Sequence, residues 1–271
     1  MKTSLSTLAV LSSLLSASHG VILLQDNFNA ATPNTNDLNV DLARQTGTLA
    51  AVPYNLAFGP GHYAHQLQNG NAINQLLVAD FGNSTSSLNF NFNGANSAGG
   101  LRISFDVDPN PAVYANGDDT IWGALNFGAS GADQQVNVNG PQTHFGILFR
   151  RSNVLQAFDG NVTLTGVEPT YSSVAGAGMR HVEIFFSDTD GNPFDGVGST
   201  QIDVYGDVNA FATPVYSFNK GAGGYANNFM NIQGLFRAHF DNLTITQIPE
   251  PASVTLAGAA GLLLLSRRRR A

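Results

Sequence analysis

The chain has 271 residues and no cysteine, with 12 Lys and Arg against 19 Asp and Glu. The lack of cysteine excludes disulfides, thiol catalysis and cysteine-bound zinc or iron–sulfur clusters. Residues 21–248 carry seven basic and eighteen acidic side chains, a net charge of −11. A body this acidic repels phosphate backbones, which argues against nucleic-acid binding.

The N-terminal segment is typical of a secretory signal peptide. Lys2 supplies the positive start, residues 5–15 are largely apolar, and residues 16–18 are small. This order predicts a signal peptide over residues 1–20, with cleavage after Ser18 or Gly20. The alternative is a buried N-terminal helix.

The region that follows is rich in short strand patterns. Apolar and polar residues alternate over 87–92, 101–107 and 201–206, which predicts half-buried strands. The runs 144–149 and 181–186 are predicted to be more deeply buried. Turn-forming clusters separate roughly a dozen such strands, so we expect one all-β domain over 21–248, a two-sheet antiparallel β-sandwich.

Both ends of this region resemble a known family. The opening "VILLQDNFN" (21–29) and the closing "RAHFDNLTITQI" (237–248) are similar to the first and last strands of concanavalin A-like (laminin G-like) jelly rolls. The resemblance rests on strand order and on a closing Asp-Asn-hydrophobic pattern. It implies that the two terminal strands lie side by side.

A loop late in the body is the best candidate for a metal site. Asp188, Asp190, Asn192 and Asp195 place four oxygen-bearing side chains around Gly191. Calcium prefers six to eight oxygen ligands on a flexible loop, so the spacing suggests calcium. The loop departs from the EF-hand pattern, because its glycine comes one position early and no glutamate stands at position 12. The alternative is an ordinary turn.

Catalytic signatures are missing from the body. Its two glutamates, Glu168 and Glu183, do not form the Glu-x-Asp-x-x-Glu pattern of concanavalin-like glucanases, and there is no Gly-x-Ser-x-Gly elbow. We therefore expect no enzyme, although a pair of aspartates would still allow glycoside hydrolysis.

Trp122 is the single tryptophan and the candidate for contact with a carbohydrate. An exposed indole would stack on a sugar ring beside polar groups. The alternative is that Trp122 fills the core.

The last residues divide into three parts. Pro249-Glu250-Pro251 interrupts regular structure, 252–266 is a nearly apolar stretch, and four arginines follow at Arg267, Arg268, Arg269 and Arg270. The fourteen residues 252–265 span about 21 Å as a helix, and snorkelling arginines help such a short helix to cross a membrane. The arginines act as a stop signal that stays cytoplasmic.

This arrangement resembles the PEP-CTERM sorting signal of exported bacterial proteins. The resemblance covers residues 249–271 and implies an exosortase, a membrane enzyme that cuts near Pro249-Glu250-Pro251. The alternative is a permanent C-terminal anchor.

The sequence thus predicts an exported, surface-sorted, non-enzymatic protein of the cell envelope or an extracellular polysaccharide matrix. The alternatives are a lectin-like carbohydrate-binding module and a polysaccharide-active enzyme that uses an aspartate pair.

Overall fold

The computed structural model describes residues 20–29, 38–39, 41–58, 66–68, 75–78, 83–92, 98–109, 122–129, 138–221, 228–235 and 238–248. The predicted signal peptide, apart from Gly20, and the predicted sorting tail lie outside these residues. No helix in the described part of the chain is long and apolar enough to span a membrane.

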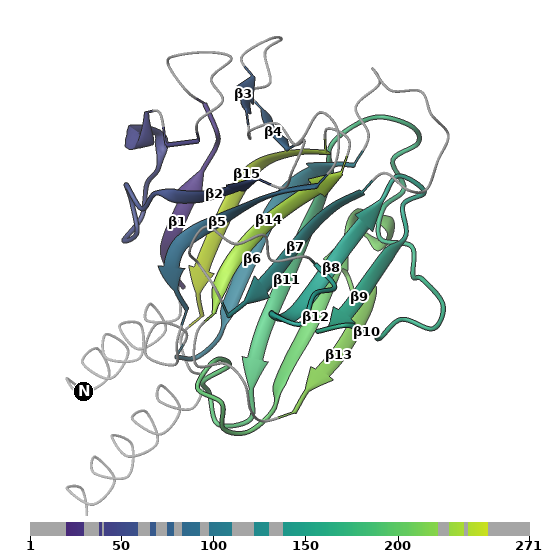
Figure 1. Cartoon of the computed structure of the whole chain (residues 1–271). Helices are drawn as coiled ribbons and strands as arrows, with labels where there is room; N and C mark the ends of the chain where they lie inside the picture. The colour runs from purple at the N-terminus through teal and green to yellow at the C-terminus, as the bar shows by residue number, and fades with distance from the viewer. Residues whose placement is uncertain are drawn as a thin grey trace, which may run out of the picture.

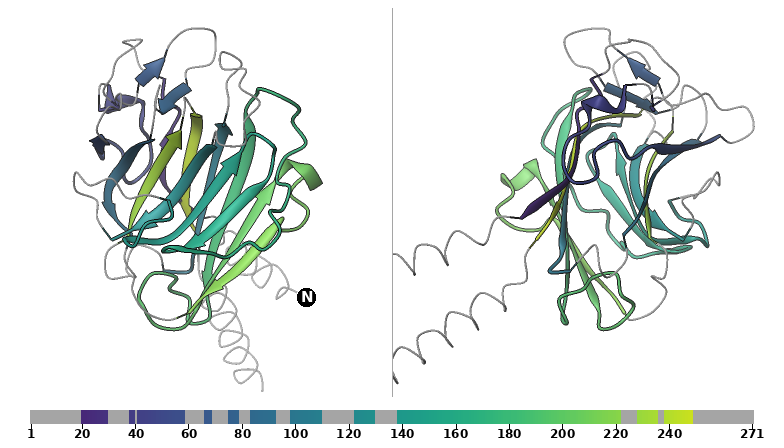
Figure 2. Two further views of the ribbon diagram at one scale, coloured as in Figure 1. Left: turned by 45° about the vertical axis from the view of Figure 1, so that its right-hand side comes forward. Right: turned by 90° about the vertical axis from the view of Figure 1, so that its left-hand side faces the viewer.

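In the described part of the chain, fifteen strands form two antiparallel sheets that pack face to face (Figures 1 and 2). The first sheet, sheet A, has the order β13-β12-β11-β6-β15-β4-β3, and β1 also pairs with β15. Sheet A contains β1 (Val21–Asp26), β3 (Gln66–Gln68), β4 (Gln75–Val78), β6 (Leu101–Asp108), β11 (Arg180–Asp188), β12 (Thr200–Gly206), β13 (Tyr216–Lys220) and β15 (Ala238–Gln247).

The second sheet, sheet B, has the order β10-β9-β8-β7-β14-β5-β2. Its strands are β2 (Tyr54–Phe58), β5 (Asn83–Asn91), β7 (Trp122–Gly128), β8 (Thr143–Arg150), β9 (Leu155–Asp159), β10 (Val162–Thr163) and β14 (Phe229–Leu235). Two short 3-10 helices, η2 (Leu42–Arg44) and η3 (Asp207–Asn209), complete the described elements. The predicted all-β, two-sheet jelly roll is confirmed.

The core between the sheets is built by alternation along the strands. In β6 the side chains of Leu101, Ile103, Phe105 and Val107 are buried, and those between them are half-buried. Sheet B contributes aromatic rings such as Phe127 and Phe145, which stack with their centroids 5.2 Å apart. The alternation predicted for 101–107 is therefore confirmed, and burial of these rings supplies much of the driving force for folding.

The two runs predicted to be deeply buried differ from one another. In β8 the residues from Phe145 to Phe149 are all buried, as expected. In β11, however, His181, Glu183 and Phe185 are half-buried and alternate with buried neighbours, so the prediction for 181–186 is wrong. The difference arises because Val138 packs closely over Gly146 on the outer face of β8, whereas the outer face of β11 is covered only in part, for example by Phe211 against His181.

The first and last strands lie side by side, as the jelly-roll resemblance implies. Val21 of β1 pairs with Gln247 of β15, and Asp26 pairs with Leu243. A bulge interrupts β15 at Asn242, whose φ of 52° lies in the left-handed region. The chain thus enters and leaves the sandwich at neighbouring positions of sheet A.

Candidate ligand-binding site

The candidate site lies on the outer face of sheet B, over β7, β8 and β9. Successive residues of a strand point to opposite faces of the sheet. Leu125 and Phe127 belong to the core between the sheets, so Trp122 and Ala124 project outward. By the same alternation along β8 and β9, the outward-facing side chains are those of Leu148, Arg150, Gln156 and Phe158.

Strand register brings these outward residues into rows. Trp122 of β7 pairs with Arg150 of β8, and Leu148 of β8 pairs with Gln156 of β9. Side chains directly opposite one another on adjacent strands lie within contact distance. The rows therefore place an indole beside a guanidinium, and an aliphatic side chain beside an amide.

A short segment of chain crosses this face and closes one side of the site. A Cβ added to Gly146 would lie 2.2 Å from the carbonyl oxygen of Val138, so the segment requires glycine there. The backbone N–H of Val138 donates to Oε1 of the buried Gln233 over 2.7 Å. These two contacts fix the height of Val138 and Asn139 above the sheet.

Below the crossing segment lies a second hydrophobic cluster, separate from the main core. Ala124, Val138, Leu148 and Phe158 are buried in it, and Trp122 packs against them half-buried. Trp122 therefore does not fill the core between the sheets. The carbohydrate contact predicted for Trp122 stays a prediction, now with a defined surrounding surface.

These residues line a cavity of about 450 Å3, formed by Trp122, Val138, Asn139, Leu148, Arg150, Gln156, Phe158 and Thr163. Ligand pockets commonly have volumes of 300 to 1,000 Å3, with an apolar lining and a few converging polar groups. Here Leu148, Phe158 and Trp122 supply the apolar surface. The polar groups are two amides, a hydroxyl and a guanidinium.

Arg150 is held at the rim by two neighbours. Its Nη2 donates to Gln156 Oε1 over 2.8 Å, and its Nε lies 3.2 Å from Glu168 Oε2. The Glu168 side chain is 32% exposed and that of Arg150 is 22% exposed. The loop that carries Glu168 is fixed to β9, because the carbonyl oxygen of Pro169 accepts the N–H of Leu155. Sequence reasoning missed this pair, since nothing in the spacing of the two residues signals contact.

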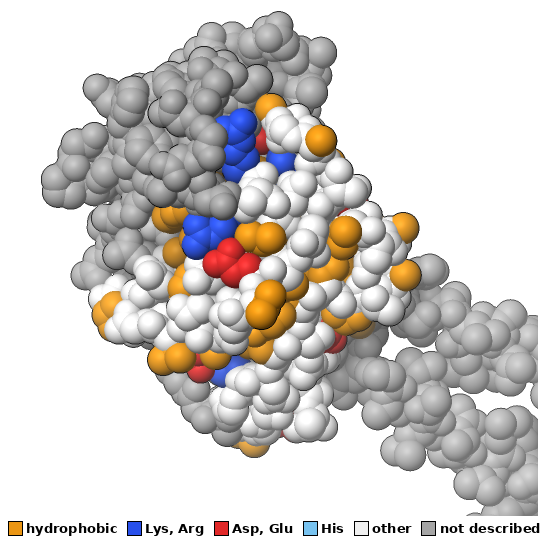
Figure 3. Space-filling view, turned by 90° about the vertical axis from the view of Figure 1, so that its right-hand side faces the viewer, with side chains coloured by type: hydrophobic (Ala, Val, Ile, Leu, Met, Phe, Trp, Pro, Cys, Tyr) orange, Lys and Arg blue, Asp and Glu red, His pale blue; other side chains and the backbone are white. Residues whose placement is uncertain are grey.

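Charge is dispersed on the edge of the sandwich that Figure 3 shows. There, basic and acidic side chains lie singly or in pairs, and hydrophobic side chains form small groups.

The predicted calcium loop is built as a series of turns. The backbone N–H of Asn192 donates to Asp190 Oδ1 over 3.0 Å, and that of Val197 donates to Asp195 Oδ1 over 2.8 Å. Asp188 Oδ2 accepts a hydrogen bond from the hydroxyl of Thr200. Within the described part of the chain, no three His, Cys, Asp or Glu side chains gather as metal ligands. These contacts support the turn interpretation. Calcium stays a prediction, which thermal melts with calcium and with chelator would test.

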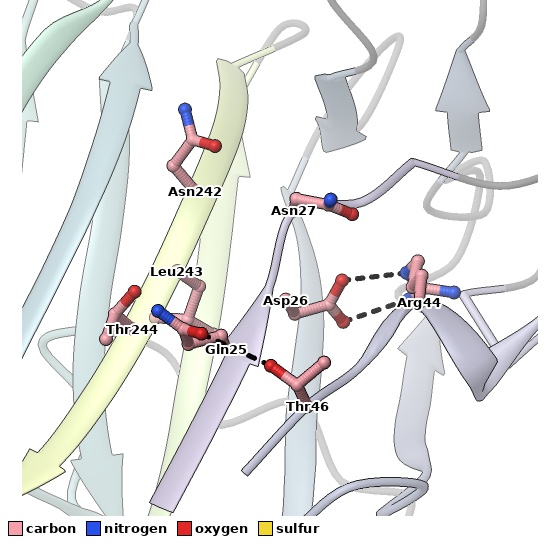
Figure 4. A pocket seen from close by; sticks show the side chains of 8 residues that line it. All are labelled: Gln25, Asp26, Asn27, Arg44, Thr46, Asn242, Leu243 and Thr244. Carbon is pink, nitrogen blue, oxygen red and sulfur yellow. Dashed lines mark hydrogen bonds and ion pairs between the residues drawn. The ribbon is translucent and has the colours of Figure 1, made fainter. Parts of the chain in front are cut away.

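A second hollow, of about 350 Å3, lies between β1 and the bulge of β15 (Figure 4). Its wall includes the ion pair of Asp26 and Arg44, whose side chains are 0% and 2% exposed. Five hydrogen bonds reach Asp26: from Arg44 Nε at 2.7 Å and Nη2 at 3.1 Å, from Gln45 Nε2 at 3.1 Å, from the Tyr54 hydroxyl at 3.0 Å, and from the Phe28 N–H at 2.8 Å. Burial raises the pKa of Tyr54 well above its usual range, so its hydroxyl remains a donor. Asp26 is thus a structural junction that joins β1 to η2 and β2.

The outer face of sheet A brings together ionisable groups from β6, β11 and β15. His181 Nδ1 lies 2.6 Å from Asp106 Oδ1, and this hydrogen bond raises the pKa of His181. Burial acts in the opposite sense on Asp106, but hydrogen bonds from His181 and Asn242 lower its pKa overall. Asp241 pairs across the strands with Asp106, and burial together with Asp106 and Asp26 raises its pKa to about 7.

Asp106 and Asp241 are two aspartates that stand opposite one another on β6 and β15. Asp241 is only 7% exposed, and neither residue lines either of the two cavities. The described residues that line the Trp122 cavity include no carboxylate. The enzyme alternative therefore gains no support from the geometry.

These observations define the class of the molecule: an antiparallel two-sheet sandwich with a ligand-sized cavity on its outer face.

No protein-family model and no curated protein matches the chain. Among solved structures, the VIP36 exoplasmic/lumenal domain in its Ca2+/Man3GlcNAc-bound form is similar at 7% identity and a TM-score of 0.45, over 72% of this chain and 86% of that one. Winged bean acidic lectin complexed with methyl-alpha-D-galactose gives 9% identity and a TM-score of 0.46, over 86% and 100%. A human SPRY domain gives 10% identity and a TM-score of 0.37, over 70% and 95%.

Proposed function

We propose that the protein is a non-enzymatic, carbohydrate-binding module that holds a sugar in the Trp122 cavity. One observation carries this proposal: a half-buried indole lies beside the polar side chains of Asn139, Arg150 and Gln156 in a cavity of about 450 Å3. A sugar ring presents an apolar C–H face and a rim of hydroxyls. The indole matches the first, and amide and guanidinium groups match the second.

Replacing Trp122 with alanine should weaken sugar binding at least about tenfold, because the aromatic contact surface is lost. A glycan array with the purified chain identifies a bound sugar, and calorimetry with that sugar compares the variants. Tyr205→Ala, which removes a half-buried ring from the outer face of sheet A, is the matched control and should bind as the wild type does. Equal loss in both variants, or no bound glycan on the array, would contradict the proposal.

We also infer that this module is exported and held at the cell surface, with a polysaccharide of the envelope or matrix as its partner. Support comes from the order of features in residues 1–20 and 249–271.

Replacing Arg267, Arg268, Arg269 and Arg270 with serine should release the chain from the membrane fraction, since the charges that hold the tail on the cytoplasmic side are gone. Cell fractionation measures this.

Changing Pro249, Glu250 and Pro251 to alanine should leave the tail attached if an exosortase acts there. The mature protein would then have a higher mass, which mass spectrometry measures. An unaltered distribution and an unaltered mature mass would count against the sorting signal.

A further inference from the structure

We propose that the Trp122 cavity is selective for acidic polysaccharides, with Arg150 as the group that recognises a sugar carboxylate. The inference rests on the proposed function and adds the class of ligand. Arg150 is the sole charged residue among the described residues that line the cavity. A neutral sugar does not need a fixed cation there, whereas a uronic acid offers a carboxylate that a guanidinium binds through paired hydrogen bonds.

The contact between Arg150 and Glu168 shows that this guanidinium takes a carboxylate as a neighbour on its Nε side. Glu168 Oε2 lies 3.2 Å from Arg150 Nε, although Glu168 itself is not part of the cavity lining. The pair is partly exposed, at 22% and 32%, and such pairs contribute only about 0 to 1 kcal/mol to stability. A carboxylate of the ligand therefore displaces or shares this contact at little energetic cost. In this arrangement Glu168 is an internal competitor of the ligand.

Arg150 is presented in an orientation that suits a ligand on the indole. It stands directly opposite Trp122 in the register of β7 and β8. The hydrogen bond from Nη2 to Gln156 Oε1, 2.8 Å long, fixes the guanidinium plane on the side of β9. A sugar ring stacked on Trp122 therefore has its substituents beside a guanidinium whose rotation is already restrained, which reduces the entropy lost on binding.

The acidic character of the whole body does not oppose this selectivity. At physiological ionic strength the screening length is about 8 Å, so distant carboxylates contribute little inside the site. The described residues of the cavity lining bring no negative charge. Among the described lining residues Arg150 is then the charged group nearest to a bound ligand, with Glu168 beside it.

The test uses polyuronides, such as oligogalacturonate, each paired with its carboxyl-reduced neutral form. Binding of the purified chain is measured by calorimetry at low and at high salt. The wild type should prefer the acidic member by about tenfold at low salt, and the preference should shrink at 1 M salt. Glu168→Gln should raise affinity for the acidic member about threefold to tenfold and leave the neutral member unaffected. Arg150→Gln should abolish the preference.

The outcomes separate this inference from the proposed function. Equal binding of the acidic and neutral members, with binding still dependent on Trp122, overturns the acidic selectivity and leaves the sugar site intact. Glu168→Gln without effect on the acidic member overturns the role of Glu168 as a competitor. An acidic preference that persists in full at 1 M salt overturns the role of the Arg150 charge, and it does so even if Arg150→Gln fails to fold. Absence of binding to every polyuronide overturns the inference, and absence of binding to any glycan overturns the proposed function with it.

Discussion

Replacing Asp26 with alanine should lower the free energy of unfolding by about 3 to 5 kcal/mol. Removing one partner of a buried ion pair leaves the other charge buried without compensation. Arg44, whose side chain is 2% exposed, would lose the carboxylate that accepts from both Nε and Nη2. The Tyr54 hydroxyl and the Gln45 amide would lose the same acceptor. Chemical denaturation followed by circular dichroism measures the change.

The matched control for this substitution is a more exposed ion pair in the same sandwich. Arg102 and Glu183 form a pair whose side chains are 41% and 16% exposed. Arg102→Ala should lower the free energy of unfolding by only about 0 to 1 kcal/mol, because solvent replaces the lost partner. Similar losses in the two variants would mean that burial does not determine the strength of the Asp26 junction.

Replacing Asp241 with asparagine should stabilise the protein by about 4 kcal/mol at pH 8 and change little at pH 4. Burial first, and the nearby carboxylates of Asp106 and Asp26 second, raise the pKa of Asp241 to about 7. A carboxyl with a higher pKa in the folded than in the unfolded chain binds its proton more tightly when folded. Its stabilising contribution is therefore complete below about pH 4 and is lost as the pH rises to about 7.

Asparagine keeps the contact that Asp241 makes in the bulge. The N–H of Asn242 donates to Asp241 Oδ1 over 2.8 Å, and an amide oxygen accepts it equally well. Denaturation curves between pH 4 and pH 8 give the difference between variant and wild type, in which the titration of groups distant from Asp241 cancels. Asp190→Asn, at an exposed turn residue, is the control and should show a difference that is flat with pH. A flat difference for Asp241→Asn as well would place the pKa of Asp241 near its ordinary value.

The elements that the sequence predicts best are those decided by local alternation. Leu101, Ile103, Phe105 and Val107 face the core because period two, once one face is buried, admits a single register. The turn-rich composition and the Asp-Asn patterns near both ends pointed to a sandwich with paired terminal strands, and β1 and β15 pair as expected. The alternation along a strand does not indicate whether other parts of the chain cover its outer face. For that reason the burial of residues 181–186 in β11 was predicted wrongly.

At the candidate site, too, some features follow from the sequence alone and others only from the tertiary structure. The sequence by itself singled out Trp122, because it is the single tryptophan of the chain. The amino-acid composition and the alternation pattern also determined the acidic charge, the absence of thiol chemistry and the strand content. Only the tertiary structure decided that Trp122 stands opposite Arg150, that Glu168 reaches the same guanidinium, and that Val138 passes over Gly146. The physical reason is that these contacts depend on strand order and on the path of a crossing segment, which many distant residues set together.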